Sequence, residues 1–250
     1  MFNPNKSSEN SEQGKIMEKV LFSSLDKKDV LEFIKEGVVH RSEIVAKKRN
    51  LKDSIEDLLN LKNNRMDEEK YRKIVNQSEY LVNWDKYIKN NQPGSNPSEP
   101  KATFAFDLFN DIAEKELDLK DEEGNIDYSR LKFYTTINSA LDYNKSVDCF
   151  FEMYDVDNEG NYIKSSEALV DFTISNNKPS DKQEVILTMD TEDATDIEYY
   201  LTYKLKQNPK LKDNLYDKYI KSFGAQVANK LKENARKARQ DSRYEFAIQA

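Results

Sequence analysis

The sequence contains very few residues of the types that form disulfides, imidazole sites or phosphate loops. Its 250 residues include one cysteine, one histidine and six glycines. The single cysteine, Cys149, excludes an intrachain disulfide framework and indicates a reducing compartment, where a buried thiol serves as a small hydrophobe. The single histidine, His40, excludes His-based triads and His-rich metal sites. Because a glycine-rich phosphate loop is also missing, we expect neither enzymatic activity nor a small-molecule substrate.

Long apolar runs are missing as well. Hydrophobic residues make up 37% of the chain and charged residues 34%, and the mean hydropathy is −0.89. No stretch approaches the roughly 18 apolar residues that a membrane-spanning helix needs, so we expect no membrane span. Residues 1–15 are polar and lack the apolar segment of a secretory signal. We expect this tail to be disordered, or ordered only against a partner.

Glycine and proline punctuate the chain too rarely for a series of β-hairpins, which favours helices. Three of the six prolines fall within residues 91–100, which we predict to be a linker between two regions. Residues 16–90 are predicted to form a helical region built around an antiparallel hairpin. Residues 101–207 are predicted to form a second helical domain. The fold class predicted from these patterns is all-α.

Apolar periodicity supports individual helices. Leu51, Ile55 and Leu58 recur at spacings of four and three, as one buried stripe of a helix requires. Trp84 is expected to be a core or interface anchor on a long N-terminal helix. Residues 208–250 are predicted to form a last helix, whose apolar residues recur every four positions. Such a stripe drifts around the helix, so it should contact different neighbours along its length.

The net charge of −7 conceals a strong asymmetry along the chain. Residues 107–198 are rich in aspartate and glutamate, whereas the helix at 204–243 is basic. The simplest interpretation of the basic stretch is a solvated helix face. The alternative is contact with an acidic surface such as a nucleic acid, a lipid or an acidic filament.

Two acidic turns share the same short sequence. Glu-Gly-Asn occurs at 123–125 and again at 159–161, 36 residues later. An EF-hand calcium loop places oxygen ligands at positions 1, 3 and 5, a glycine with positive φ at position 6 and a bidentate glutamate at position 12. The spacing of acids and glycine in the second turn, with Gly160 at position 6, follows this rule.

The second turn departs from the motif after its glycine, since the last carboxylate arrives one residue late. The candidate metal ligands are Asp155, Asp157, Glu159 and Glu167. We expect their binding of Ca²⁺ to be weak or absent, because a displaced bidentate ligand opens the oxygen cage. In the first turn Leu119 and Arg130 occupy two ligand positions, so no binding is expected there.

Residues 124–169 resemble the EF-hand calcium-sensor superfamily, especially its neuronal calcium sensor, calcineurin B and calaxin branch. The resemblance rests on Gly124-Asn125-Ile126-Asp127-Tyr128, Phe151-Glu152-Met153-Tyr154-Asp155-Val156-Asp157, Tyr162-Ile163 and Glu167-Ala168-Leu169. It implies an all-helical fold of paired hands, joined through Ile126 and Ile163, with a groove that grips a partner helix. Residues 101–207 would then be a degenerate EF-hand-like domain, and the missing ligands favour an adaptor over a sensor.

Three functions remain open from the sequence. The first is a non-enzymatic EF-hand-like adaptor, a structural subunit that makes protein–protein contacts in a larger cytoplasmic assembly. Family analogy alone points this assembly toward a cilium, an axoneme or the cytoskeleton. The second is a calcium-binding sensor that uses the loop at 155–167. The third is a binder of nucleic acid or lipid through the basic helix 204–243, which predicts strongly salt-dependent binding.

Overall fold

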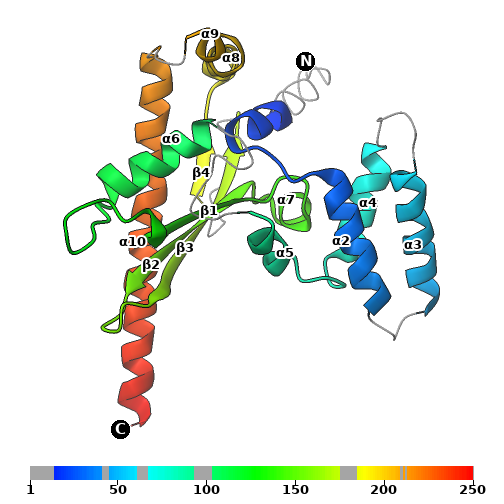
Figure 1. Ribbon diagram of the computed structural model, residues 1–250, viewed down its shortest axis with the longest axis horizontal. Coiled ribbons are helices and arrows are strands. Elements are labelled where there is room, and N and C mark those ends of the chain that lie inside the picture. Colours follow the sequence, from blue (N-terminus) through cyan, green and yellow to red (C-terminus); the bar gives the residue numbers. More distant parts are fainter. Residues whose placement is uncertain are drawn as a thin grey trace, which may run out of the picture.

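The structure, a computed structural model shown in Figure 1, describes residues 14–40, 45–60, 67–92, 103–174, 185–208, 211 and 213–249. Most of the predicted tail 1–15 and most of the predicted linker 91–100 therefore lie outside the described residues. None of the described helices is long and apolar enough to cross a bilayer.

A four-stranded mixed β-sheet lies at the centre of the described chain. Its strands are β1 (Leu131–Thr135), β2 (Cys149–Val156), β3 (Tyr162–Thr173) and β4 (Val185–Thr188). They are ordered β1-β2-β3-β4. The β1–β2 and β2–β3 pairs are antiparallel, and the β3–β4 pair is parallel. The all-α fold class predicted from the sequence is therefore wrong, because the fold combines helices with a sheet.

The strands were mistaken for helices because the central strand is buried on both faces. In β2, Cys149 and Phe151 face one hydrophobic core, and Phe150 between them faces another. A strand with two buried faces gives a continuous apolar run instead of a clean alternation. Periodicity alone does not distinguish such a run from a buried helix. The enrichment in aromatic side chains was the remaining signal for a strand.

The two Glu-Gly-Asn turns precede and join strands, so the predicted helix–loop–helix geometry is wrong for both. The first turn leads through a 3₁₀ turn, η2 (Tyr128–Arg130), into β1, and the second closes the β2–β3 hairpin. Gly124 and Gly160 have φ of 85° and 83°, as predicted for the sixth position of each turn. Ile163 is 55% exposed, so it does not form the buried pair with Ile126 that paired hands require.

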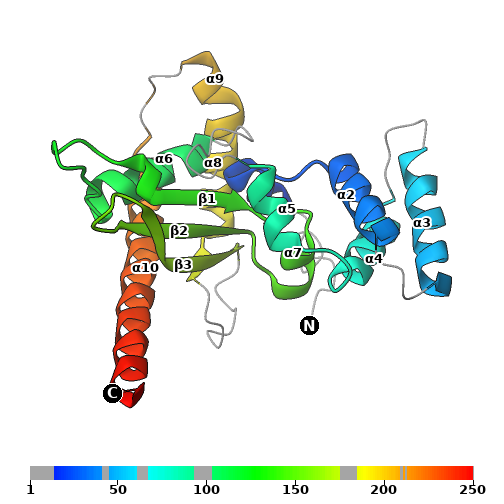
Figure 2. The ribbon, with the colours of Figure 1, turned by 60° about the horizontal axis from the view of Figure 1, so that its bottom comes forward.

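One face of the sheet is covered by helices from both ends of the chain, as Figures 1 and 2 show. These are the N-terminal helix (14–22), α6 (Thr103–Asp111), α8 (Thr191–Tyr199) and α10 (Asn214–Gln249). Two π-helical turns and a short helix extend α6 and α8, namely η1 (Ile112–Glu116), η3 (Tyr200–Lys204) and α9 (Leu205–Gln207). Met17, Phe22 and Phe223 are fully buried members of this first core.

The C-terminal region predicted to form a helix over 208–250 contains α10, which begins at Asn214 and is longer than its apolar stripe. This helix begins after Asp213, whose carboxylate accepts hydrogen bonds from the N–H groups of Leu215 and Tyr216 and so caps the helix. The last α10 residue in the first core is Ala235. Beyond the sheet, α10 continues as a projecting rod, drawn in red in Figures 1 and 2.

The other face of the sheet meets a second group of helices, here called the helical lobe. It consists of α2 (Lys27–His40), α3 (Val45–Leu59), α4 (Glu68–Ser78), α5 (Trp84–Asn90) and α7 (Ala140–Lys145). The stripe Leu51, Ile55 and Leu58 is buried in its core, as predicted, and Trp84 is buried there too. The single long helix predicted to carry Trp84 is divided, because Asn83 caps the start of α5 by accepting from the N–H of Lys86.

Candidate functional site

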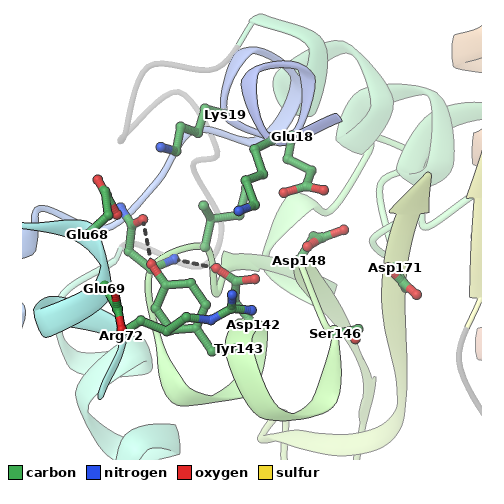
Figure 3. Close-up of a pocket in the computed structure, with 13 residues that line it drawn as sticks. Glu18, Lys19, Glu68, Glu69, Arg72, Asp142, Tyr143, Ser146, Asp148 and Asp171 are labelled. Carbon is green, nitrogen blue, oxygen red and sulfur yellow. Dashed lines mark hydrogen bonds between the residues drawn. The ribbon is translucent and has the colours of Figure 1, made fainter. Parts of the chain in front are cut away.

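A cavity of about 500 Å³ lies where the N-terminal helix, α4 and α7 meet the ends of β2 and β3. Figure 3 shows its polar lining. The charged side chains that line it are Lys15, Glu18, Lys19, Glu68, Glu69, Arg72, Asp142, Asp148 and Asp171. Charges of both signs from segments far apart in the sequence therefore converge on one space.

Two of these carboxylates, Asp148 and Asp171, are only 3% and 2% exposed. Asp148 immediately precedes β2, and its N–H donates to Val170 O at 2.8 Å. Its Oδ2 accepts from the N–H of Phe172 at 2.6 Å. Since Cys149 pairs with Val170 in the sheet register, Asp148 and Asp171 stand opposite each other on neighbouring strands. Their side chains leave the same face of the sheet, which is the face that meets the helical lobe.

The environment of Asp148 disfavours its negative charge. Burial raises the pKa of Asp148 well above its ordinary value, and the nearby carboxylates of Glu18 and Asp171 raise it further. Buried like charges are stable only when a proton or a cation neutralises them. Figure 3 places Glu18 beside Asp148, with Asp171 on the adjacent strand. The carboxylate side of the cavity is therefore suited to a proton or to a bound cation.

The opposite side of the cavity carries three cations in addition to the carboxylates of Glu68 and Glu69. Lys15 and Lys19 come from the N-terminal helix and Arg72 from α4. Burial raises the pKa of Asp142 to about 6, although these three cations act in the opposite direction. Asp142 lies between the two sides, as Figure 3 shows. The cavity thus has carboxylates at the strand ends and charges of both signs on the helices.

Asn138 holds three walls of the cavity together. Its backbone is left-handed, with φ of 74°, a conformation that asparagine tolerates better than most residues. Its N–H donates to Asp142 Oδ2 at 2.8 Å, and its Nδ2 donates to Leu25 O at 2.9 Å. Its carbonyl accepts from the hydroxyl of Tyr71 at 2.8 Å. One residue therefore joins α7, the segment after the N-terminal helix, and α4.

The carboxylates do not form a closed metal cage by themselves. Within the described ranges, no three histidine, cysteine, aspartate or glutamate side chains are grouped closely enough to hold a metal ion. Mg²⁺, however, is usually bound through one or two carboxylates, with waters and substrate phosphate oxygens completing an octahedron. Asp148 and Asp171 therefore suit a hard divalent cation that shares its coordination with a bound phosphate.

The calcium ligands predicted from the sequence lie at the far end of the β2–β3 hairpin. Asp155 forms ion pairs with Arg239 at 2.7 Å and Arg130 at 3.6 Å. Asp157 stabilises the turn by accepting from the N–H groups of Glu159 and Asn161, each at 2.8 Å.

The fourth predicted ligand lies elsewhere on the hairpin. Glu167 pairs with Glu152 in the register, three positions before Asp155 along β2, which corresponds to roughly 10 Å. Its carboxylate accepts from Lys164 Nζ at 2.6 Å. Calcium binding by these residues stays a prediction.

The basic helix that was predicted to meet an acidic surface is partly neutralised within the chain. In addition to the Arg239–Asp155 pair, Lys230 and Lys237 both form ion pairs with Glu233, at 3.3 and 2.5 Å. Contact of 204–243 with an acidic partner also stays a prediction.

The sequence analysis did not identify Glu18, Asp148 or Asp171 as site residues. Asp148 directly precedes the apolar run that became β2, and Asp171 lies between Val170 and Phe172. A charged residue inside or beside a buried apolar run is uncommon without a partner or a function. That signal was present in the sequence. The sequence could not show that Asp148 and Asp171 lie side by side, because that depends on the register between β2 and β3.

Comparison with known proteins gives no match to a family model, to a curated protein or to a solved structure. The function must therefore be argued from the chemistry of the cavity.

Proposed function

We propose that this protein is a divalent-cation-dependent phosphodiesterase that cleaves nucleic acid. The observation that carries the proposal is the cavity itself, because buried Asp148 and Asp171 line the same space as the basic side chains of Lys15, Lys19 and Arg72. The adaptor function expected from the sequence depended on paired EF-hands, and the sheet replaces them. The expectation of no enzymatic activity rested on histidine and glycine-rich loops, neither of which this chemistry requires.

Each charged side of the cavity matches one part of the proposed reaction. Asp148 and Asp171 would hold the cation, which supplies Lewis acidity and a water of lowered pKa. Lys15, Lys19 and Arg72 would bind and orient the negatively charged phosphate. The oxygen of water forms a bond to phosphorus as the bond from phosphorus to one bridging oxygen breaks. The leaving oxygen takes up a proton, and the attacking water loses one.

The arrangement of the lysines favours a polymeric substrate. Lys15 and Lys19 are four residues apart on one helix, and side chains at that spacing are neighbours about 5–6 Å apart. Both are exposed, so they can meet successive phosphates of a nucleic-acid strand. A cavity of about 500 Å³ also falls within the ordinary size range of ligand sites.

Cleavage of labelled single-stranded and duplex DNA and RNA, with Mg²⁺ or with a chelator, tests the proposal. We expect Mg²⁺-dependent cleavage that Asp148→Asn and Asp171→Asn each reduce by about 100-fold or more. Loss of even an outer partner of a metal ligand already costs 10–100-fold. Asp155→Asn removes an equal charge at the far end of the hairpin and serves as the control.

Two results would contradict the proposal. One is cleavage that persists unchanged when the chelator is present. The other is an Asp148→Asn variant that is as active as the Asp155→Asn control while both remain folded.

A further inference from the structure

We infer that Arg72, carried by the helical lobe, binds a phosphate of the substrate, so that the lobe forms one wall of the active site. This inference rests on the proposed function. It assigns a role to α4, which lies in sequence far from the carboxylates at the ends of β2 and β3.

Helix α4 is fixed against the cavity by the residue next to Arg72. Tyr71 is fully buried, and its hydroxyl donates to Asn138 O at 2.8 Å. Its ring meets that of Tyr143 edge-on, with centroids 6.2 Å apart. The start of α4 is capped by Asp67, which accepts from the N–H of Lys70 at 3.0 Å. These contacts fix both the position and the rotation of α4, so Arg72 is presented at the cavity.

The guanidinium of Arg72 is held by an aromatic ring. Its Cζ lies 5.0 Å from the centroid of the Tyr143 ring, within the range of a cation–π contact. Figure 3 shows Arg72 between Tyr143 and Asp142. Within the described part of the chain, Arg72 makes no ion pair within 4.0 Å, although Glu68 and Glu69 line the same cavity. A guanidinium packed through its face keeps its N–H edges available for an oxyanion.

This geometry fits an oxyanion such as a phosphate better than a neutral ligand. The planar guanidinium binds two phosphate oxygens at once, which fixes orientation as well as position. Lys15 and Lys19 stand on a different wall, formed by the N-terminal helix. A nucleic-acid strand bound in the cavity would therefore be held from two sides, with one of its phosphates directed toward Asp148 and Asp171.

Binding of a fluorescent single-stranded DNA, measured without metal over a range of salt concentrations, tests this role. We expect Arg72→Gln to weaken binding about 10-fold and to reduce the slope of log K against log salt by about 0.7, the value for one phosphate contact on a single strand. Arg72→Lys keeps the charge, so it should keep the slope while losing part of the affinity. Lys73→Gln is the matched control, because Lys73 is the exposed next residue of α4 and does not line the cavity.

Turnover and metal binding separate this inference from the proposed function. Arg72→Gln should raise KM for the DNA and leave Mg²⁺ binding, measured by calorimetry, unchanged, whereas Asp148→Asn should abolish Mg²⁺ binding. If Asp148→Asn abolishes cleavage but Arg72→Gln behaves like Lys73→Gln, the inference is wrong and the proposed function stands. If wild-type protein does not cleave any of the nucleic acids, the proposed function is wrong and Arg72 has no substrate to orient.

Discussion

Glu152 is a buried carboxylate held between two lysines on the sheet face that meets the helical lobe. Its side chain is 1% exposed and lies 2.6 Å from Lys164 Nζ and 2.9 Å from Lys89 Nζ. The hydroxyl of Tyr154 donates to it at 2.8 Å. Burial opposes its ionisation, but these hydrogen bonds outweigh burial and lower the pKa of Glu152. The carboxylate is therefore charged in the folded protein and stabilised by its three partners.

Glu152→Gln should remove a pH-dependent part of the stability. Because the folded pKa is lowered, this stability is present above the ordinary value of 4.5 and is lost as the pH falls through the folded pKa. At pH 7 we expect the variant to lose about 1.5–3 kcal/mol, the usual contribution of hydrogen bonds to a charged group, because the two lysines are partly exposed and are not left as buried charges. Urea unfolding at pH 7 and in acid measures the difference.

The control for this prediction is Glu167→Gln. Glu167 shares Lys164 with Glu152 but is 33% exposed, so its loss should cost less than about 1 kcal/mol. A destabilisation of Glu152→Gln that is equally large at neutral and acid pH would contradict the assignment.

Helices α6 and α10 approach closely at Gly224. A Cβ built on Gly224 would lie 2.6 Å from Asp111 Oδ2. Asp111 is 3% exposed, and its Oδ1 accepts from Lys115 Nζ at 2.7 Å. A larger residue at 224 would have to displace this buried carboxylate. The glycine therefore serves the packing of the two helices, although it weakens α10 on its own.

Gly224→Ala should destabilise the protein despite a better helix former. Alanine stabilises a helix by about 1 kcal/mol relative to glycine. Overpacking of a core costs about 1–3 kcal/mol, and we expect the upper end of that range here, because the new methyl group would displace a buried carboxylate. We expect a net loss of about 1–2 kcal/mol in chemical unfolding. Gly14→Ala, where a Cβ meets nothing within 4 Å, is the control.

A double-mutant cycle tests whether the clash with Asp111 causes the loss of stability in Gly224→Ala. Asp111→Ala removes the group that the new methyl would strike, so Gly224→Ala should cost less in that background. Additive effects of the two substitutions would show that Asp111 is not the obstacle.

At the level of elements, the sequence predicted helices with one buried stripe and failed on strands with two buried faces. The stripe of α3 and the long α10 were identified because polar residues cover their remaining surfaces. The apolar run at Phe150 and Phe151 predicts a helix, because adjacent apolar residues fit the buried face of a helix as well as a strand that is buried on both faces. Only the partner strands decide between them, and those contacts are not local in sequence.

The candidate site was less predictable than the fold. Its carboxylates could have been flagged as charges within apolar runs, as at Asp171. Arg72 carries no comparable signal, since an exposed arginine on an amphipathic helix is ordinary. Its place at the cavity depends on Tyr71 and Asn138, which are 67 residues apart. The acidic turns were a stronger pattern in the sequence, but their carboxylates serve the hairpin and its ion pairs.

The two hydrophobic cores meet across the sheet, so the whole molecule should unfold as one unit. Phe150 belongs to the second core, and its ring stacks on Tyr134 with centroids 4.9 Å apart. Its neighbours in the chain, Cys149 and Phe151, belong to the first core. Because both cores pack against β2, loss of packing on one face of this strand should also weaken the packing on its other face.

Phe150→Ala should destabilise both cores together. Truncating a buried phenylalanine costs about 3–5 kcal/mol. We expect calorimetry to show a single transition at a lower temperature, and hydrogen exchange to rise in the helical lobe and under the sheet alike. Phe106→Ala, at a position that is 41% exposed on α6, is the control. Two separate transitions, with only the helical lobe affected, would contradict this coupling.

The first core also joins the earliest described helix to the latest. Met17 and Phe22 share it with Phe223, Val227 and Leu231 of α10. At 5–20 residues per second, a ribosome needs roughly 10–40 s to make the chain between these partners. During that interval the part of the sheet face that α10 covers stays exposed to solvent. Until α10 is synthesised, the nascent chain therefore carries an incomplete first core.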